Sequence, residues 1–188
     1  MSAICVYCAS GPVDDEYPDL ASRMGTAIAT GGHTLISGGG NVSMMGAVAT
    51  ATRAAGGRTV GIIPRGLMAR EVADLDADEL VVTETMRERK RLMDERSDGF
   101  ITLPGGIGTL EELFETWTGG FLGEHHKPVA LLDHRGFYQP MLTWLDDLCG
   151  RGFVSAKALA RLRVVPTVEL ALDAATGGVV GFGDTPGG

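Results

Sequence analysis

The sequence has no long apolar run, no block of basic residues and only three cysteines among its 188 residues. A helix that spans a bilayer needs about 20 predominantly apolar residues, and no stretch approaches that length. With a net charge of −8 and no basic block, the chain lacks the cationic surface that holds nucleic-acid phosphates. An odd cysteine count suits a reducing compartment, and the first residues lack the basic start and cleavage site of a signal peptide. We therefore expect a cytoplasmic protein with no membrane and no nucleic-acid partner.

Metal and redox patterns are also lacking. Two of the four histidines are adjacent and the other two are scattered elsewhere in the sequence, which does not match the spacing of a metal site. They are His33, His125, His126 and His134. Cys5 and Cys8 have C-x-x-C spacing, but they fall in an expected strand, where residues three apart face opposite sides of a sheet. We predict that both are small core residues, and we expect no metal.

Apolar segments alternate with amphipathic helical patterns along the whole chain. The expected strands are residues 4–8, 33–37, 59–63, 80–83, 99–103, 128–133 and 162–165. The expected helices are residues 19–30, 48–55, 84–96, 109–120, 137–149 and 168–174. Near-continuous apolar strands that alternate with helices are typical of a parallel sheet covered on both faces. The sequence therefore predicts an α/β fold, a Rossmann-like doubly wound parallel sheet, in one domain at 1–176 with a glycine-rich flexible tail at 177–188.

The most informative stretch is FITLPGGIGTLEELFE, residues 100–115. It begins as an apolar strand, passes through a glycine turn and continues as a helix. Thr109 is the expected N-cap, with Glu112 three residues later. An uncovered helix N-terminus after such a turn can bind phosphate, because its N–H groups point outward and the helix dipole favours an anion. The glycine spacing matches neither the Walker A pattern nor the dinucleotide fingerprint, and a plain turn with a capping box is an alternative interpretation.

Three loops in the sequence follow expected strands and are candidates for one shared site. They are residues 8–11, 38–46 and 104–109. Parallel sheets of this kind bind ligands at the carboxyl ends of their strands, next to the switch in strand order. We expect the three loops to converge there, and Ser10 and Gly39 are the ligand contacts that we predict in the first two.

The charged segment MRERKRLM, residues 86–93, is a further candidate for the site. Met86 and Met93 are one heptad apart, and Arg89 and Lys90 fall between them on the same stripe of a helix. Cations on a stripe that packs inward need an anionic partner or a route to water. We therefore expect Arg89 and Lys90 to be buried or to face a ligand. Glu71, in an irregular segment, is a weaker candidate that the pattern alone places on a loop surface.

Three pieces of the sequence together resemble the LONELY GUY family, the cytokinin riboside 5′-monophosphate phosphoribohydrolases often mislabelled as lysine decarboxylases. The pieces are PGGIGTLEE at 104–112, the Arg89-Lys90 pair after Met86, and Gly38-Gly-Gly with Met44-Met45-Gly46. The resemblance extends from about residue 4 to residue 169. It implies a Rossmann-like homodimer with active sites near the subunit interface. It also implies hydrolysis of the N-glycosidic bond of an adenine-type nucleoside 5′-monophosphate, without a cofactor, to free base and ribose 5-phosphate.

The resemblance also implies roles for individual residues. The family's motif arginine and glutamate correspond to Arg89 and Glu112, which we take as catalytic. Its substrate contacts correspond to Glu71, Lys90, Gly106, Ile107, Gly108, Thr109, Leu110, Glu111 and Thr118. A lysine decarboxylase would need a lysine that binds pyridoxal phosphate, and neither Lys90 nor Lys127 has a sequence context that supports this role.

The residues themselves are consistent with this chemistry. Breaking an N-glycosidic bond builds positive charge on the sugar, which a nearby carboxylate can stabilise while it orients or deprotonates water. We expect Glu112 to do the chemistry, Glu111 to support it, and Arg89 to hold the phosphate or sugar and keep Glu112 ionised. Two alternatives stay open on sequence alone: a general AMP nucleosidase, and a nucleotide- or cofactor-binding carrier without catalysis.

Overall fold

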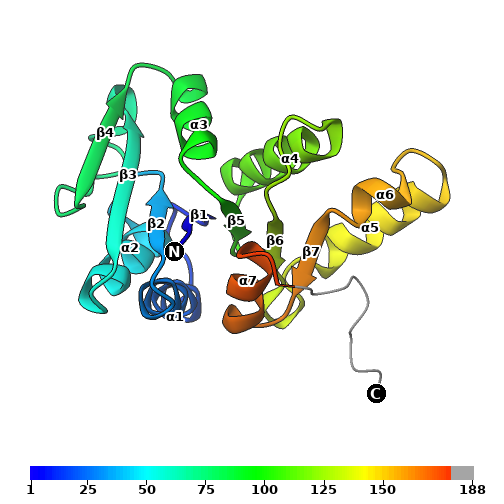
Figure 1. The fold of residues 1–188 in the computed structure, drawn as a ribbon, viewed down its shortest axis with the longest axis horizontal. Coiled ribbons are helices and arrows are strands. Elements are labelled where there is room, and N and C mark those ends of the chain that lie inside the picture. Colours follow the sequence, from blue (N-terminus) through cyan, green and yellow to red (C-terminus); the bar gives the residue numbers. More distant parts are fainter. Residues whose placement is uncertain (179–188) are drawn as a thin grey trace.

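In the computed structural model, which describes residues 1–178, seven parallel strands form one sheet in the order β4-β3-β2-β1-β5-β6-β7 (Figure 1). The strands are β1 Ala3–Tyr7, β2 Thr34–Ser37, β3 Arg58–Pro64, β4 Glu79–Thr83, β5 Gly99–Thr102, β6 Val129–Leu132 and β7 Leu162–Val165. The prediction of a doubly wound parallel sheet is confirmed. Most of the predicted flexible tail, residues 179–188, lies outside the described residues.

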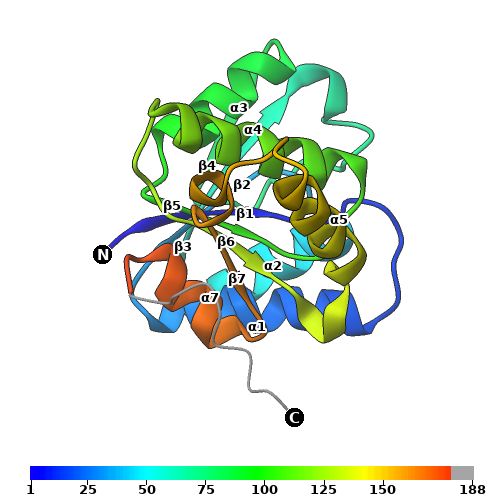
Figure 2. The same ribbon diagram turned by 90° about the vertical axis from the view of Figure 1, so that its right-hand side faces the viewer.

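Helices cover both faces of the sheet (Figures 1 and 2). One face packs against α1 Glu16–Thr30, α2 Ser43–Ala54 and α7 Val168–Ala175. The other packs against α3 Met86–Glu95, α4 Ile107–Leu122, α5 Gln139–Gly150 and α6 Ala156–Leu159. The strands read as continuous apolar runs because both of their faces are buried, as in parallel sheets generally.

The strand order reverses at β1, which lies between β2 and β5. The chain first builds the sheet outward from β1 to β4 and then returns to add β5 on the other side. Loops that leave the carboxyl ends of β1 and β5 therefore diverge and leave a crevice between them. The two loops begin side by side, since the Ala9 amide donates to the Pro104 carbonyl at 3.3 Å, and they separate beyond that point.

The buried cysteines of β1 and its following loop behave as the sequence predicts. Cys5 packs in the core under α3 and α4, whereas Cys8 packs in the core on the opposite face. Burial raises the pKa of both thiols well above its ordinary value, because the thiolate would lose its hydration. Both are free, and they do not form a redox pair.

The helix after β5 differs from the prediction at both ends. It begins at Ile107 with Gly106 as N-cap and no side-chain cap, so Thr109 is a helical residue and its prediction as N-cap was wrong. The predicted end near Gly119 and Gly120 was also wrong. Both glycines are buried inside the helix, which ends at Leu122 because Gly123 adopts the left-handed conformation, with φ +86°, that terminates helices.

Several short elements were not predicted. They are the 3₁₀ turns Arg65–Leu67 and His134–Gly136 and the four-residue α6. Such elements are too short to show a hydrophobic period. Within residues 1–178, no helix is both long and apolar enough to cross a bilayer, and no cluster of histidine, cysteine and acidic side chains has the arrangement of a metal site.

Candidate active site

The turn between β5 and α4 presents open backbone amides. Gly106, Ile107 and Gly108 are exposed, and a Cβ added at Gly106 or Gly108 would meet no atom within 4 Å. The first intrahelical bond of this turn comes from the Leu110 amide to the Gly106 carbonyl at 3.0 Å, so the preceding amides have no acceptor within the helix. These amides lie at the positive end of a 16-residue helix. The turn therefore has the geometry of an anion seat.

The rest of the same turn is tightly packed, which fixes the position of the amides. A Cβ at Gly105 would lie 2.1 Å from Thr109 Oγ1, so only glycine fits there. Thr109 is accordingly buried. Tyr138, also buried, donates its hydroxyl to the Leu103 carbonyl at 2.8 Å and supports the strand end from α5's side.

Glu112 lies on the second turn of α4, about one helical turn beyond the open amides. It is partly buried, and this burial raises the pKa of its carboxyl to about 7. Arg89 opposes the increase as the main nearby positive charge, and Lys90 does so more weakly. Glu111 and Glu71 add to the increase because like charges disfavour ionisation. A carboxyl with a pKa near neutrality can act as a general base in the cell.

Arg89 is the buried cation of the site, as the stripe on α3 predicts. Its side chain is 5% exposed. Nε donates to the Ile62 carbonyl at 3.1 Å and Nη2 to the Gly38 carbonyl at 3.0 Å, so the guanidinium is held against the carboxyl ends of β2 and β3. The prediction that Met86 shares the buried stripe was wrong, since Met86 is 43% exposed.

Glu71 faces the same guanidinium, although the sequence pattern alone placed it on a loop surface. Its Oε2 is 3.6 Å from Arg89 Nη2, and this oxygen is buried without a hydrogen-bond partner among the described residues. A buried carboxylate oxygen that lacks a donor is unusual in folded proteins. It leaves an acceptor available for a ligand hydroxyl.

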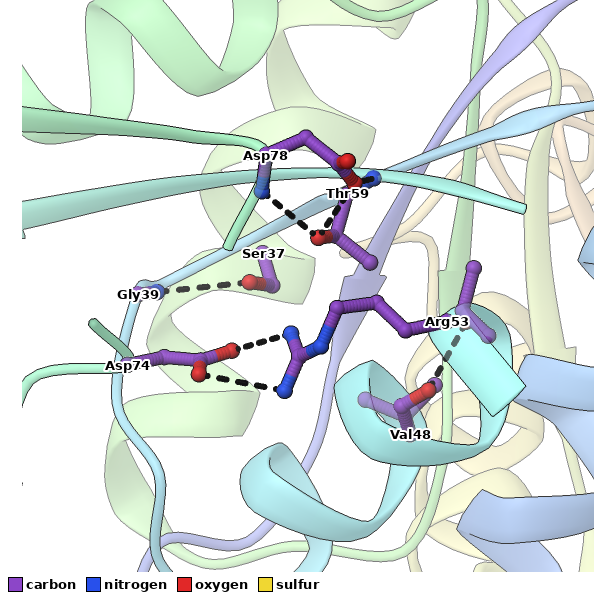
Figure 3. A network of polar contacts seen from close by, with 8 residues as sticks. Ser37, Gly39, Val48, Arg53, Thr59, Asp74 and Asp78 are labelled. Carbon is purple, nitrogen blue, oxygen red and sulfur yellow. Dashed lines mark hydrogen bonds and ion pairs between the residues drawn. The ribbon is translucent and has the colours of Figure 1, made fainter. Parts of the chain in front are cut away.

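The segment that carries Glu71 is fastened to the sheet by a polar network (Figure 3). Arg53 of α2 donates two hydrogen bonds to Asp74, at 2.7 and 3.2 Å. Asp78 accepts from the amide and the hydroxyl of Thr59 on β3. The Asp74 amide donates to the Gly39 carbonyl at 2.9 Å, which joins the segment to the glycine turn after β2.

Lys90 lies beside the site and pairs with two carboxylates of α4, Glu111 and Glu115. Partial burial lowers the pKa of the Lys90 ammonium, but the hydrogen bonds to these partners outweigh it and the pKa is raised. Lys90 and Glu111 therefore connect α3 to α4 along the edge of the site.

The structure brings most of the predicted site residues together, but not all of them. Gly39 lies in the turn that Arg89 contacts, with φ +73°, and Ser10 is exposed in the loop that follows β1. Leu110 is half-buried against the core below the seat. Thr118 is exposed on α4, six residues beyond Glu112 and therefore on a different face of the helix. In a single subunit, Thr118 therefore lies away from the side of α4 that carries Glu112.

A cavity of about 230 Å³ lies between α3 and α4 and has Glu112 in its wall. Its lining also includes Tyr7, Thr116 and His125, none of which the sequence indicated as site residues. Tyr7 ends β1 and Thr116 is one turn after Glu112, so they meet only in the folded protein. Their residue types did not indicate a functional site in the sequence, because a tyrosine in a strand and a threonine in a helix are common in protein cores.

The arrangement combines an anion seat, a buried cation and a partly buried carboxyl of raised pKa. A phosphorylated sugar seated on the α4 amides would extend past Glu112 toward Arg89 and Glu71. Such a set can bind a phosphate monoester and stabilise positive charge that develops on the attached sugar. The same turn geometry can also bind a nucleotide without reacting with it.

Comparisons with known proteins agree with this geometry. The family model described as possible lysine decarboxylase matches residues 45–175. A Mycobacterium tuberculosis protein named cytokinin riboside 5′-monophosphate phosphoribohydrolase is 54% identical over 91% of this chain and 91% of that protein. The rice enzyme of the same name, called LOG, is 42% identical over 88% of this chain and 69% of its own length.

A solved structure shows the same fold at lower identity. The molybdenum cofactor binding protein of Rippkaea orientalis superposes with a TM-score of 0.70, covers 92% of this chain and 93% of its own, and is 24% identical. That likeness concerns the fold alone. The sequence matches are more specific, and with the amide seat, Arg89 and Glu112 in place, they show that the chain belongs to the LONELY GUY family, whose model carries the description of a possible lysine decarboxylase.

Proposed function

We propose that the protein hydrolyses the N-glycosidic bond of cytokinin riboside 5′-monophosphates, which are N6-modified adenosine 5′-monophosphates, to free base and ribose 5-phosphate. The names of the relatives at 54% and 42% identity support the reaction. The observation that carries the proposal is the open row of α4 amides one turn before Glu112, with Arg89 nearby. This geometry supports a 5′-phosphate on the amides and a sugar next to the Glu112 carboxyl.

The residues divide the work of this reaction. The amides of 106–109 hold the phosphate, and the Glu112 carboxylate stabilises the positive sugar and accepts a proton from the attacking water. Arg89 holds the phosphate or the sugar and favours the ionised form of Glu112. Glu71 Oε2, which has no hydrogen-bond donor among the described residues, accepts a hydrogen bond from a ribose hydroxyl. Lys90 and Glu111 set the spacing of α3 and α4. Ser10 and Gly39 contribute from the neighbouring strand ends.

The direct test replaces Glu112 with glutamine. Glu112→Gln keeps the shape and removes the ionisable group, so base release should fall by roughly 10²- to 10⁴-fold while nucleotide binding persists. Calorimetry measures binding, and chromatography of the free base measures turnover. Full activity in the variant would show that Glu112 takes no part in the mechanism. If the wild-type protein binds the nucleotide but releases no base, the carrier alternative would be favoured.

A general AMP nucleosidase is the second candidate, because the site offers contacts to phosphate and ribose that every adenosine monophosphate shares. The ratio of kcat/KM for an N6-isopentenyl nucleotide to that for AMP decides between the two. A ratio well above one supports the cytokinin nucleotide, and a ratio near one supports the general nucleosidase.

Decarboxylation of lysine is not supported by the lysines near the site. Lys90 is paired with Glu111 and Glu115. Lys127 contacts the Asp94 side chain and the Asp94 carbonyl. A lysine that forms a Schiff base needs a depressed pKa and a free amine. Lys90 has a raised pKa instead.

We also propose that the protein is a homodimer that pairs through an exposed face of α4. Ile107, Phe121 and Leu122 are exposed and lie within about a third of the helix circumference, together with Thr118. An exposed apolar stripe of this kind commonly marks an interface. Such a dimer would bring Thr118 to the substrate of the partner subunit. Leu122→Asp should convert the protein to a monomer in light scattering, and a monomeric wild type would contradict the proposal.

Two further assignments concern the domain organisation and the location of the protein. A single seven-stranded sheet includes elements from Ala3 to Val165, and α7 packs on it, which supports one domain at residues 1–176. Three free cysteines support a reducing, cytoplasmic location.

A further inference from the structure

The cavity between α3 and α4 lies behind Glu112, away from the amide seat. The wall of the cavity contains Glu112, Thr116 and Gly119 of α4, and Tyr7 of β1 also lines it. Its volume of about 230 Å³ exceeds several times the roughly 30 Å³ that one water occupies in the liquid. Four charged residues of α3 also line it, so the wall can hydrogen-bond to water. A polar space of this size has room for a small cluster of water molecules.

Two hydroxyl groups meet in this wall next to Glu112. Tyr7 Oη and Thr116 Oγ1 are 3.0 Å apart. Thr116 is four residues after Glu112 and therefore on the same face of α4. The pair shares one hydrogen bond, so each hydroxyl keeps further capacity to bond to water. Both groups are thus placed to hold water beside the carboxyl.

A third hydroxyl on the same side of the sheet indicates internal water. Thr102 is the register partner of Tyr7 on β5, and its side chain points to the same face. Its Oγ1 is fully buried and has no hydrogen-bond partner among the described residues. A buried hydroxyl without a protein partner is normally satisfied by a bound water. A water bound to Thr102 Oγ1 would lie on the same face of the sheet as Tyr7.

His125 positions this wall but does not carry protons through it. Its Nδ1 accepts from the Lys127 amide at 3.2 Å, which requires that Nε2 carries the proton in the neutral ring. Nε2 then donates to the Thr116 carbonyl at 2.8 Å. Both ring nitrogens are occupied, so hydroxyls and water remain as the carriers.

The reaction in the proposed function needs such a route. When water attacks the sugar, its oxygen bonds to C1′ and one of its protons passes to Glu112, while the electron pair of the glycosidic bond leaves with the base. The base takes a proton from solvent, and Glu112 must release its own before the next turnover. A nucleotide whose phosphate binds the amide seat would cover the carboxyl from that direction. The cavity is lined by none of residues 106–109 and approaches the carboxyl from the direction of Thr116 and Gly119.

We propose that the α3–α4 cavity carries the water through which Glu112 exchanges protons with solvent, and that Tyr7 and Thr116 are the positioning residues that hold this water against the carboxylate. This inference rests on the proposed function, and it assigns to the hydroxyl pair a part in proton transfer that does not require contact with the substrate.

The charges around Glu112 set the direction of the expected change. The titratable and charged groups whose charges interact with Glu112 come from β1 and the residue after it, the 65–78 segment, α3 and α4. They are Cys5, Tyr7, Cys8, Glu71, Arg89, Lys90 and Glu111. Conservative removal of a hydroxyl leaves all the formal charges in place. Because hydroxyl and water donors favour the ionised carboxylate, their loss should raise the pKa of Glu112.

The kinetic test uses Tyr7→Phe and Thr116→Val, which remove one hydroxyl each at nearly constant volume. We expect kcat to fall roughly 3- to 10-fold with KM changed by less than about twofold. The acidic limb of the kcat profile should move to higher pH by roughly half a unit. Thr116→Ser restores the hydroxyl and should restore both readouts.

A matched control separates this effect from the loss of any buried hydroxyl. Thr52→Val removes a fully buried hydroxyl that bonds to the Val48 carbonyl in α2, on the opposite face of the sheet. It should leave kcat and the pH profile unchanged. The proposal is overturned if Thr52→Val reproduces the shift, or if Tyr7→Phe and Thr116→Val leave the pH profile unchanged. It is also overturned if the whole effect falls on KM, because the cavity would then bind substrate.

A measurement without substrate keeps this inference testable even if the proposed reaction fails. Carbon-13 NMR of the glutamate carboxyls follows the titration of Glu112, whose signal is assigned by its loss in Glu112→Gln. We expect a higher midpoint in Tyr7→Phe and Thr116→Val than in the wild type or Thr52→Val. Equal midpoints in all four proteins would sink the role of the hydroxyl pair, whereas the absence of base release from any nucleotide would refute only the reaction.

Discussion

The two glycine-rich turns at the carboxyl edge of the sheet look alike in sequence but differ in their surroundings. After β2, Gly38, Gly39 and Gly40 are all buried. A Cβ at Gly38 would lie 1.9 Å from Arg89 Nη2, and one at Gly40 would lie 2.7 Å from Met45 Cε. After β5, Gly106 and Gly108 are exposed and would accept a Cβ without any contact within 4 Å.

The difference shows that glycine serves two purposes in one site. In the β2 turn, the missing side chains let the backbone approach a guanidinium and hold it with a carbonyl. In the β5 turn, they keep the amides of a helix N-terminus uncovered. The first turn fixes the cation and the second leaves room for the anion. A glycine-to-alanine substitution should therefore lower the free energy of unfolding in the first turn and raise it in the second.

The largest effect is expected from Gly38→Ala. The new methyl overlaps the guanidinium, so Arg89 must leave its two carbonyl partners, and overpacking of this kind costs about 1–3 kcal/mol of the free energy of unfolding. We expect kcat/KM to fall by roughly 100-fold as the cation shifts. Urea unfolding and base release measure the two effects. Activity within threefold of the wild type would mean that the close approach is dispensable.

The carboxyl between the two turns should make stability depend on pH. The pKa of Glu112 is about 7 in the folded protein, against an ordinary value of 4.5. The folded state therefore binds this proton more tightly, and the stabilisation is present below about pH 4.5 and is lost as pH rises through about 7, on the order of 3 kcal/mol. Glu112→Gln should consequently be more stable than the wild type at pH 8 and similar to it near pH 4.5. Parallel stability curves for both proteins would contradict the raised pKa.

A smaller effect is expected from Gly108→Ala in the open turn. Alanine is the better helix former, so the free energy of unfolding should rise by up to about 1 kcal/mol. The added methyl stands beside the amides, and KM for the nucleotide should rise by roughly tenfold. Gly150→Ala is the control, because Gly150 also lies in a helix with nothing within 4 Å of the added Cβ. It should change stability only, and an unchanged KM in Gly108→Ala would argue against this turn as the anion seat.

The smallest effect is expected from Lys90→Ala. Its two ion pairs are partly solvated, so their loss should cost less than about 1 kcal/mol. Lys90 also lowers the pKa of Glu112, although less than Arg89 does, and the midpoint of Glu112 should therefore rise slightly in NMR titration. Arg151→Ala, which breaks an exposed pair with Asp147 on α5, serves as control. A midpoint that does not move, or that moves equally in both variants, would show that Lys90 has no specific influence on the carboxyl.

Much of the fold was predictable because the central strands are buried on both faces and read as apolar runs, whereas the edge strand β4 is partly exposed. The start of α4 was not, since Thr109 has the side chain of a cap while the chain enters the helix through glycines. The burial of Arg89 followed from its helical stripe. The orientation of Glu71 did not, because it depends on the Arg53–Asp74 pair between α2 and an irregular segment.

The cavity behind Glu112 was also beyond sequence reasoning. Tyr7 and Thr116 are 109 residues apart in the chain, and neither belongs to a recognisable motif. The space between two helices depends on how far apart they pack. The separation of α3 and α4 depends here on long-range contacts such as the ion pairs of Lys90 with Glu111 and Glu115.

The 65–78 segment is attached by the side chains of Asp74 and Asp78 and by the carbonyls of Glu71 and Val72, which both accept from the Asn41 amide. Residues 66–70 precede these contacts, and most of them are exposed. A library restricted to positions 66–70 would vary the residues next to Glu71 and leave these contacts, the sheet and α4 unchanged. Directed evolution toward other purine nucleotides therefore has a natural starting place in this protein.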